Sequence, residues 1–234
     1  SILSHYVGLD YHDVVIIPQG YDPADFAFAH GSKPSQRRKM RITHAGTFYA
    51  DRNPSVLLHA LHNVFQDTPQ IRGRVEVTFV GNTREEDQLL VNKFGLQNDV
   101  IFHGYLPHQE CTQRLCDSDI LWLVLDNDYQ SPGKLYEYFG ARKPILGSVM
   151  EGYTKQLVLE SGAGVCVPLK DIKAHETAFR ELFAQYEKNQ LGKISEEFAT
   201  RYNRRVLTGE LARQFESLMD LDKNALVKRE EEVS

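Results

Sequence analysis

The sequence predicts an α/β fold with a Rossmann-like parallel sheet of about six strands flanked by helices. Short apolar runs recur along the chain, and stretches with the spacing of amphipathic helices separate them. One run, Ile120–Leu125, is apolar at every position. Strands that are apolar throughout are typical of a parallel sheet covered by helices on both faces. The expected strands are residues 41–47, 75–81, 100–104, 120–126, 144–149 and 164–168.

Helical spacing links these strands in the order expected of βαβ units. Apolar residues recur on one face in residues 56–65, 89–94 and 135–139, and only helical patterns follow the last strand, in residues 171–189, 192–201 and 203–222. Before the first strand, Val14–Ile17 predicts a short strand that runs into a turn. We therefore expect an interdomain linker at residues 1–40, a Rossmann-like domain at 41–222 and a charged, solvated C-terminal tail at 223–234.

The composition narrows the classes of function. With 234 residues, of which 41% are hydrophobic, the chain can bury the core of one large or two small domains. Its formal net charge of −5 gives no basic field that would attract nucleic acid. No apolar run approaches the roughly 20 residues that a membrane-spanning helix needs. The three cysteines are odd in number and lack metal-ligand spacing, so we expect reduced thiols in a cytoplasmic protein.

The most informative segment directly follows the strand that is apolar throughout. Ser131 is placed to cap a helix, and Pro132 to occupy its first turn. The N–H groups of Gly133 and Lys134 would then have no partners inside the helix, and the helix dipole behind them favours an anion. Glu137 lies on the same helix face as Gly133, where its carboxylate could accept two hydrogen bonds from a diol such as ribose. The alternative is an ordinary helix start with an exposed Lys134–Glu137 ion pair that contributes about 0.2–0.5 kcal/mol.

The loop after the first strand supplies a second candidate phosphate contact. Gly46 allows close backbone approach at the carboxyl end of the strand, and Thr47 follows it. Arg52 precedes the next helix, where its planar fork could grip an oxyanion. Because the carboxyl ends of parallel strands share one edge of the sheet, the two loops could converge on one pyrophosphate. The alternative is an ordinary strand-to-helix turn with a surface arginine.

Glycine also marks the ends of the next two strands. Gly81 ends the second strand, and His103, Gly104 and Tyr105 follow the third. Exposed backbone groups at these positions could read the edge of a nucleobase, although simple turn chemistry explains the same residues. The sequence has no metal-binding motif, no dinucleotide fingerprint and no phosphate-binding loop that ends in Gly-Lys-Ser/Thr. We therefore expect neither a metal nor a cofactor.

Taken in order, these segments resemble the C-terminal, donor-binding half of retaining glycosyltransferases with the GT-B fold, glycosyltransferase family 4 in particular. The specific match is Ser-Pro-Gly-Lys-Leu-Tyr-Glu-Tyr-Phe-Gly-Ala-Arg-Lys-Pro-Ile-Leu-Gly, which begins at Ser131. Supporting matches are Val-Ile-Ile-Pro-Gln-Gly-Tyr-Asp, Ala-Gly-Thr-Phe-Tyr-Ala-Asp-Arg-Asn-Pro, Thr-Phe-Val-Gly and Ile-Phe-His-Gly-Tyr-Leu. The resemblance implies one of two Rossmann-like halves, with the reaction in the cleft between them.

The resemblance also implies roles for individual residues. The helix start that matches Gly133, Lys134 and Leu135 receives the donor pyrophosphate in that family, and the acid that matches Glu137 holds the ribose. The family's basic residue six positions after the loop glycine falls on Arg52, which implies a diphosphate contact.

The chain departs from the family pattern at two positions. Thr47 stands where many members carry arginine, so one positive charge is missing. Tyr129 stands where members with paired glutamates carry the first of them, leaving Asp128 or Gln130 to replace it.

The resemblance thus implies a nucleotide-sugar-binding domain that serves the transfer of a hexose-type sugar from a nucleoside-diphosphate sugar to a saccharide, lipid-linked or protein acceptor. Lys134 and Arg52 would be catalytic, because they offset the charge on the departing nucleoside diphosphate. Acceptor binding belongs to the missing N-terminal half, so we expect an excised domain that is inactive alone and associates with membranes only through that half. The alternatives are a degenerate nucleotide-sugar sensor or scaffold, and a GT-B-fold epimerase or phosphorylase.

Overall fold

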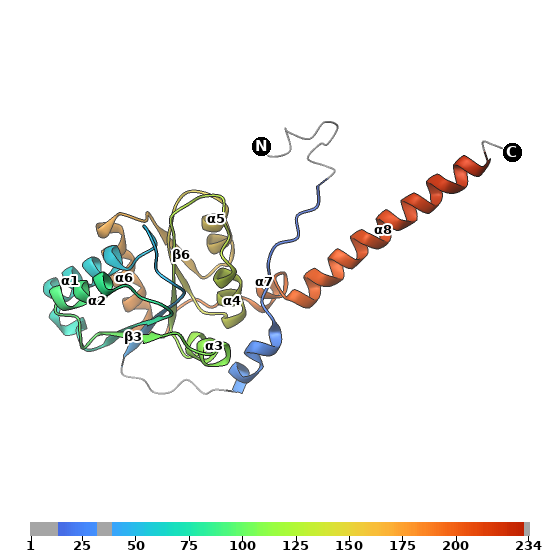
Figure 1. Cartoon of the computed structure of the whole chain (residues 1–234). Helices are drawn as coiled ribbons and strands as arrows, with labels where there is room; N and C mark the ends of the chain where they lie inside the picture. The colour runs from blue at the N-terminus through green and yellow to red at the C-terminus, as the bar shows by residue number, and fades with distance from the viewer. Residues whose placement is uncertain (1–13, 32–38, 232–234) are drawn as a thin grey trace.

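The computed structural model describes residues 14–31 and 39–231 (Figure 1). Within these residues, six parallel strands form one sheet in the order β3-β2-β1-β4-β5-β6. The predicted α/β fold with a parallel sheet is confirmed, and every expected strand matches an observed one to within two residues at either end. The strands are β1 (Met40–Ala45), β2 (Val75–Val80), β3 (Val100–Gly104), β4 (Ile120–Leu125), β5 (Ile145–Val149) and β6 (Gly164–Val167).

Helices cover both faces of the sheet (Figure 1). One face carries α1 (Ser55–Asp67), α2 (Glu85–Lys93) and α6 (Ile172–Glu187). The other face carries α3 (His108–Cys116), α4 (Gly133–Ala141), α5 (Tyr153–Glu160) and α7 (Glu196–Thr200). Two short 3₁₀ helices, η3 (Pro23–Gly31) and η4 (Pro69–Ile71), precede β1 and β2, and a long final helix, α8 (Arg204–Glu231), projects away from the sheet.

The central strand β4 explains why the sequence specifies two covered faces. All six of its side chains are buried. Ile120, Trp122 and Val124 pack into the core under α1 and α6, and the three leucines between and after them pack under α4. Because successive side chains of a strand point to opposite faces, only a strand apolar at every position can fill both cores.

The sheet is least continuous at its centre. β1 pairs with β2 over all six residues from Met40 to Ala45. With β4, its pairing is confined to Ile42 opposite Ile120 and Thr43 opposite Leu121. No further pairs join β1 and β4, and the loops that follow them lead to helices on opposite faces of the sheet.

Three expectations about the ends of the chain are wrong. Val14–Ile17 forms no strand with any described residue, and the one β-type pairing of the described residues 14–31 is the isolated bridge between Tyr21 and Asn203. The helix expected at 192–201 begins only at Glu196, where Ser195 accepts a hydrogen bond from the Phe198 N–H as N-cap. The final helix continues past 222 to Glu231. The rest of the expected linker and tail, residues 1–13, 32–38 and 232–234, lies outside the described residues.

Candidate functional site

The candidate site lies where the loops after β1 and β4 diverge. These strands are neighbours in the sheet, but β1 leads to α1 on one face and β4 leads to α4 on the other. Open α/β sheets bind ligands at such a topological switch point, beyond the carboxyl ends of the strands. Of the predicted residues on the first loop, Arg52 contacts the second loop, where it reaches Asp126 and Gln130 ahead of Ser131 and the start of α4.

Helix α4 begins at this point with free N–H groups. Pro132 is the N-cap residue, with φ −69° and ψ 143°, and no side chain caps the helix. The Leu135 N–H donates to the Pro132 carbonyl at 2.9 Å, but the N–H groups of Gly133 and Lys134 have no acceptor among the described residues. A Cβ atom added at Gly133 would lie 3.0 Å from Gln19 Oε1 and within 4 Å of no other atom outside its own helix turn, so the flexible end of the Gln19 side chain is what lies beside the first residue of α4.

The predicted capping arrangement is wrong. Ser131 does not cap α4, because its hydroxyl accepts a hydrogen bond from the Tyr136 hydroxyl at 2.9 Å. Pro132 takes the N-cap position and does not enter the first turn. The side chain of Leu135, another predicted site residue, is fully buried in the core, and its N–H is already bonded. The free donors at the helix start are therefore Gly133 and Lys134.

Tyr138, in the second half of α4, holds the helix against the point where the pairing of β1 and β4 ends. Its buried hydroxyl accepts from the Ala45 N–H at 3.0 Å and donates to the Trp122 carbonyl at 3.1 Å. It thereby replaces the ladder bond that these two strands no longer make. The same carbonyl accepts from His44 Nδ1 at 3.0 Å. Burial lowers the pKa of His44 to about 4, an effect that the Trp122 carbonyl opposes and the charge of Lys134 reinforces, so this ring is neutral.

Lys134 and Glu137 form an ion pair on α4. Lys134 Nζ lies 2.8 Å from Glu137 Oε2, and the side chains are 33% and 22% exposed. Lys134 also approaches the sulfur of the buried Cys111 on α3, at 4.0 Å. The pair is therefore less exposed than the ordinary surface pair that the sequence left as an alternative. Glu137 Oε1 has no partner among the described residues, so one carboxylate oxygen remains available.

Arg52 joins the two loops. Its Nε donates to Asp126 Oδ1 at 2.6 Å and one Nη donates to Gln130 Oε1 at 2.6 Å. The other Nη contacts the hydroxyl of Tyr49, and the guanidinium lies over the Tyr49 ring. These partners were not anticipated from the sequence. A carboxylate directly after a buried strand, as at Asp126, was the one signal that could have suggested a partner for a basic residue on the neighbouring loop.

Glycines let the strand ends pack closely beside the site. The Gly46 N–H donates to the Val80 carbonyl at 2.8 Å, and the Gly81 N–H donates to the Gly104 carbonyl at 2.7 Å. A Cβ atom at Gly81, where φ is +121°, would lie 2.3 Å from the Gly46 carbonyl oxygen. Only glycine fits there.

The predicted residues at the end of β3 lie farther along the sheet. Tyr105 is 81% exposed. Partial burial and the charge of Arg114 on α3 lower the pKa of His103. Among the described residues, no hydrogen bond or ion pair joins either side chain to Arg52, Lys134 or Glu137, whereas the backbone of Gly104 reaches the loop after β1 through Gly81.

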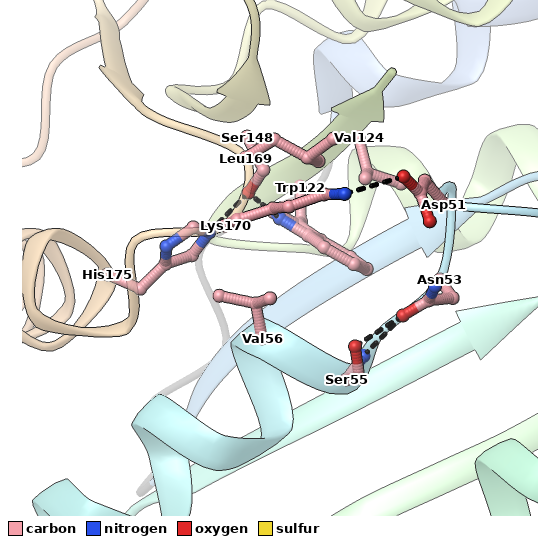
Figure 2. Close-up of a pocket in the computed structure, with 10 residues that line it drawn as sticks. All are labelled: Asp51, Asn53, Ser55, Val56, Trp122, Val124, Ser148, Leu169, Lys170 and His175. Atoms are coloured by element: carbon pink, nitrogen blue, oxygen red, sulfur yellow. Dashed lines mark hydrogen bonds and ion pairs between the residues drawn. The ribbon is translucent and has the colours of Figure 1, made fainter.

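On the face of α1 and α6, a cavity of about 210 Å³ lies beyond β4 and β5 (Figure 2). At its base Ser148 accepts from Trp122 Nε1 and donates to His175 Nε2, both at 2.7 Å. At its mouth Lys170 Nζ lies 2.8 Å from Asp51. The buried polar atoms are fully bonded to one another, as a core network requires.

Metal ligands are not gathered at this site. Within residues 14–31 and 39–231, no three histidine, cysteine, aspartate or glutamate side chains are placed to hold a metal ion. None of the helices in the described part of the chain combines the length and hydropathy that crossing a bilayer requires.

Comparison with solved structures shows the same fold in several glycosyltransferases. A glycosyltransferase from Rickettsia africae superposes with a TM-score of 0.73 at 14% identity, over 93% of this chain and 60% of that one. HepE from Anabaena, solved with UDP and glucose, gives 0.71 at 15% identity, over 90% and 59%. Sucrose-phosphate synthase from Thermosynechococcus elongatus gives 0.65 at 15% identity, over 88% and 52%. The chain thus spans about half to three fifths of the length of these structures.

The sequence comparisons place the chain in one family. No curated protein sequence matches it. The family model for glycosyl transferases group 1 matches residues 39–185, which is more than half of the chain and includes β1 to β6 with the switch-point loops between them. The chain therefore belongs to the glycosyl transferases group 1.

Proposed function

We propose that the chain is the nucleotide-sugar-binding domain of a glycosyltransferase, and that the start of α4 holds the diphosphate of the donor. The observation that carries the proposal is the pair of free N–H groups on Gly133 and Lys134, which lie at the switch point and at the positive end of the α4 dipole. Family membership supports the reaction class. The structure of HepE with UDP and glucose, which shares the fold, supports a nucleoside diphosphate as the ligand.

The residues around α4 suggest how the domain contributes to transfer. As the glycosidic bond loosens, negative charge grows on the departing diphosphate, and the two N–H groups with the Lys134 ammonium offset it. Glu137 keeps Oε2 on Lys134 and offers Oε1 to a ribose hydroxyl. This scheme gives no role to a metal or cofactor.

The rest of the enzyme would lie in the part of related structures that this chain does not span. We infer that acceptor binding requires an N-terminal half, and that the isolated domain binds a hexose-type donor without transferring it. Any association with a membrane would also come through that half.

Calorimetric titration of the chain with UDP, GDP, dTDP and UDP-glucose tests the proposal. We expect saturable binding of at least one nucleotide without turnover, and binding of none would contradict it. Gly133→Pro sharpens the test, because proline removes one N–H but is well tolerated in the first turn of a helix. We expect this variant to lose about tenfold or more in affinity, as a charge-assisted hydrogen bond implies. Gly133→Ala, which keeps the N–H, is the control.

A sensor or scaffold is the second candidate. Tyr129, which is 76% exposed, stands where the resemblance places the first glutamate of members with the paired-glutamate motif. Addition of the missing half distinguishes the two functions: transfer of the sugar supports the enzyme, and tight nucleotide binding without transfer supports the sensor.

A further inference from the structure

The guanidinium of Arg52 already has hydrogen-bond partners, so it is not an unpaired cation open to a phosphate. Its guanidinium donates to Asp126 and to Gln130, each at 2.6 Å, and contacts the Tyr49 hydroxyl. The Arg52 side chain is only 13% exposed. Its charge is therefore already paired, in a position where solvent screens the interaction less than at the surface.

The partners of Arg52 belong to the loop that leads into α4. Asp126 directly follows β4, and Gln130 lies three residues before Gly133, where α4 begins. Between them, Asn127 Nδ2 lies 3.3 Å from Asp126 Oδ1 and 3.1 Å from Gln130 Oε1. The Gln130 N–H donates back to Asn127 Oδ1 at 3.0 Å. Arg52 thus completes a hydrogen-bond network that spans the loop from its first residue almost to the helix.

The same network also contacts α5, and one of its members, Asp126, carries a full negative charge. Thr154 on α5 donates to the Gln130 carbonyl at 2.7 Å, which fixes the far end of the loop. Partial burial would raise the pKa of Asp126, but its hydrogen bond and ion pair with Arg52 outweigh burial and lower that pKa. Asp126 is therefore ionised at neutral pH. If Arg52 left it for a phosphate, this carboxylate would face the phosphate as an unpaired like charge.

We propose that Arg52 is a positioning residue of the nucleotide-sugar site, which holds residues 126–130 so that the first N–H groups of α4 face the diphosphate. It stays on Asp126 when the nucleotide binds. This inference rests on the proposed function, and it changes the role that the family resemblance implies for Arg52, from direct contact with the diphosphate to support of the loop beside it.

Asp126→Asn separates these two roles because they predict opposite signs. If Arg52 were a phosphate ligand, loss of its counter-charge would free the guanidinium, and UDP would bind more tightly. If Arg52 positions the loop, the variant weakens UDP binding about fivefold to tenfold, the loss expected when a charge-assisted hydrogen bond becomes a neutral one. Arg52→Lys, which keeps the charge but loses the planar fork, should weaken binding to a similar extent. The double variant should bind no more weakly than the weaker single variant. Tighter binding by Asp126→Asn overturns the proposal.

Hydrogen exchange tests the positioning role without a nucleotide. In both single variants, amides of residues 126–134 should exchange about tenfold faster or more, because local opening becomes easier. Arg180→Lys and Asp67→Asn are matched controls, since Arg180 Nη2 donates to Asp67 at 2.9 Å between α6 and the far end of α1. These controls should leave both exchange in 126–134 and UDP affinity unchanged. If the unmodified chain binds no nucleotide, the proposed function fails on its own, whereas unchanged exchange in the Arg52 and Asp126 variants overturns the positioning role.

Discussion

Replacement of Tyr138 by phenylalanine removes the hydroxyl that bridges β1 and β4 where their ladder ends. That hydroxyl is buried and bonds to the Ala45 N–H at 3.0 Å and to the Trp122 carbonyl at 3.1 Å. The carbonyl keeps its bond from His44, but the buried Ala45 N–H loses its acceptor. An unsatisfied buried donor costs about 1–3 kcal/mol, so we expect the free energy of unfolding to fall by about 2 kcal/mol. For a domain of this size, that corresponds to a Tm lower by about 4–8 °C.

Tyr136→Phe is the matched control for this prediction. Tyr136 lies on the same helix and is equally buried, but its hydroxyl makes one bond, to the partly exposed Ser131, which water can replace. We expect it to cost no more than about 1 kcal/mol. Urea denaturation followed by the fluorescence of Trp122, the one tryptophan of the sequence, measures both variants. If Tyr138→Phe proves no more costly than Tyr136→Phe, the bridging role of the Tyr138 hydroxyl is refuted.

Three further predictions concern the ligand, the pH dependence and the close packing of the loops. Glu137→Gln should weaken UDP binding about tenfold but leave binding of 2′,3′-dideoxy-UDP unchanged in calorimetry, and an equal loss for both ligands would contradict a ribose contact. The pKa of His44 is about 4 in the folded protein and about 6.5 in the unfolded chain. The contribution of this histidine to the free energy of unfolding is therefore complete above about pH 6.5 and is lost as the pH falls toward about 4. The free energy of unfolding should fall by about 3 kcal/mol from this residue alone. Urea denaturation across this pH range should show a smaller fall for His44→Gln than for the unmodified chain. Gly81→Ala should cost about 3 kcal/mol or more, because its Cβ would lie 2.3 Å from the Gly46 carbonyl oxygen. Gly73→Ala, at another positive φ but with no atom within 4 Å of the added Cβ, should cost about 1 kcal/mol in the same denaturation assay.

The architecture was predictable because its signals are local. A strand apolar at every position, such as Ile120–Leu125, fits only where both sheet faces are covered. The end of the last helix was not predictable from charge, because Glu, Lys and Arg are good helix formers and a charged run can continue a helix to Glu231. The apolar segment Val14–Ile17 has the composition of a strand, but no described sheet edge pairs with it.

The candidate site was only partly predictable, because its contacts depend on residues far apart in sequence. The free N–H groups of α4 follow from the helix start after a buried strand, and they are present in the structure. The role of the Ser131 hydroxyl depends on Tyr136, whose hydroxyl donates a hydrogen bond to it, and Ser131 does not cap the helix. Arg52 and Asp126 are 74 positions apart, and only the order of strands in the sheet makes their loops neighbours.

Only two residue pairs join β1 to β4, so the sheet consists of two three-stranded halves, β3-β2-β1 and β4-β5-β6, with a short contact between them. Separating β1 from β4 would therefore break fewer backbone hydrogen bonds than separating any other two neighbouring strands of this sheet. Binding at the start of α4 favours the closed arrangement of residues 126–130, which Arg52 ties to the loop after β1, and so favours the contact between the two halves. Bound protein should therefore resist being pulled apart at the centre of its sheet, and the gain in mechanical strength would be largest where the empty fold is weakest.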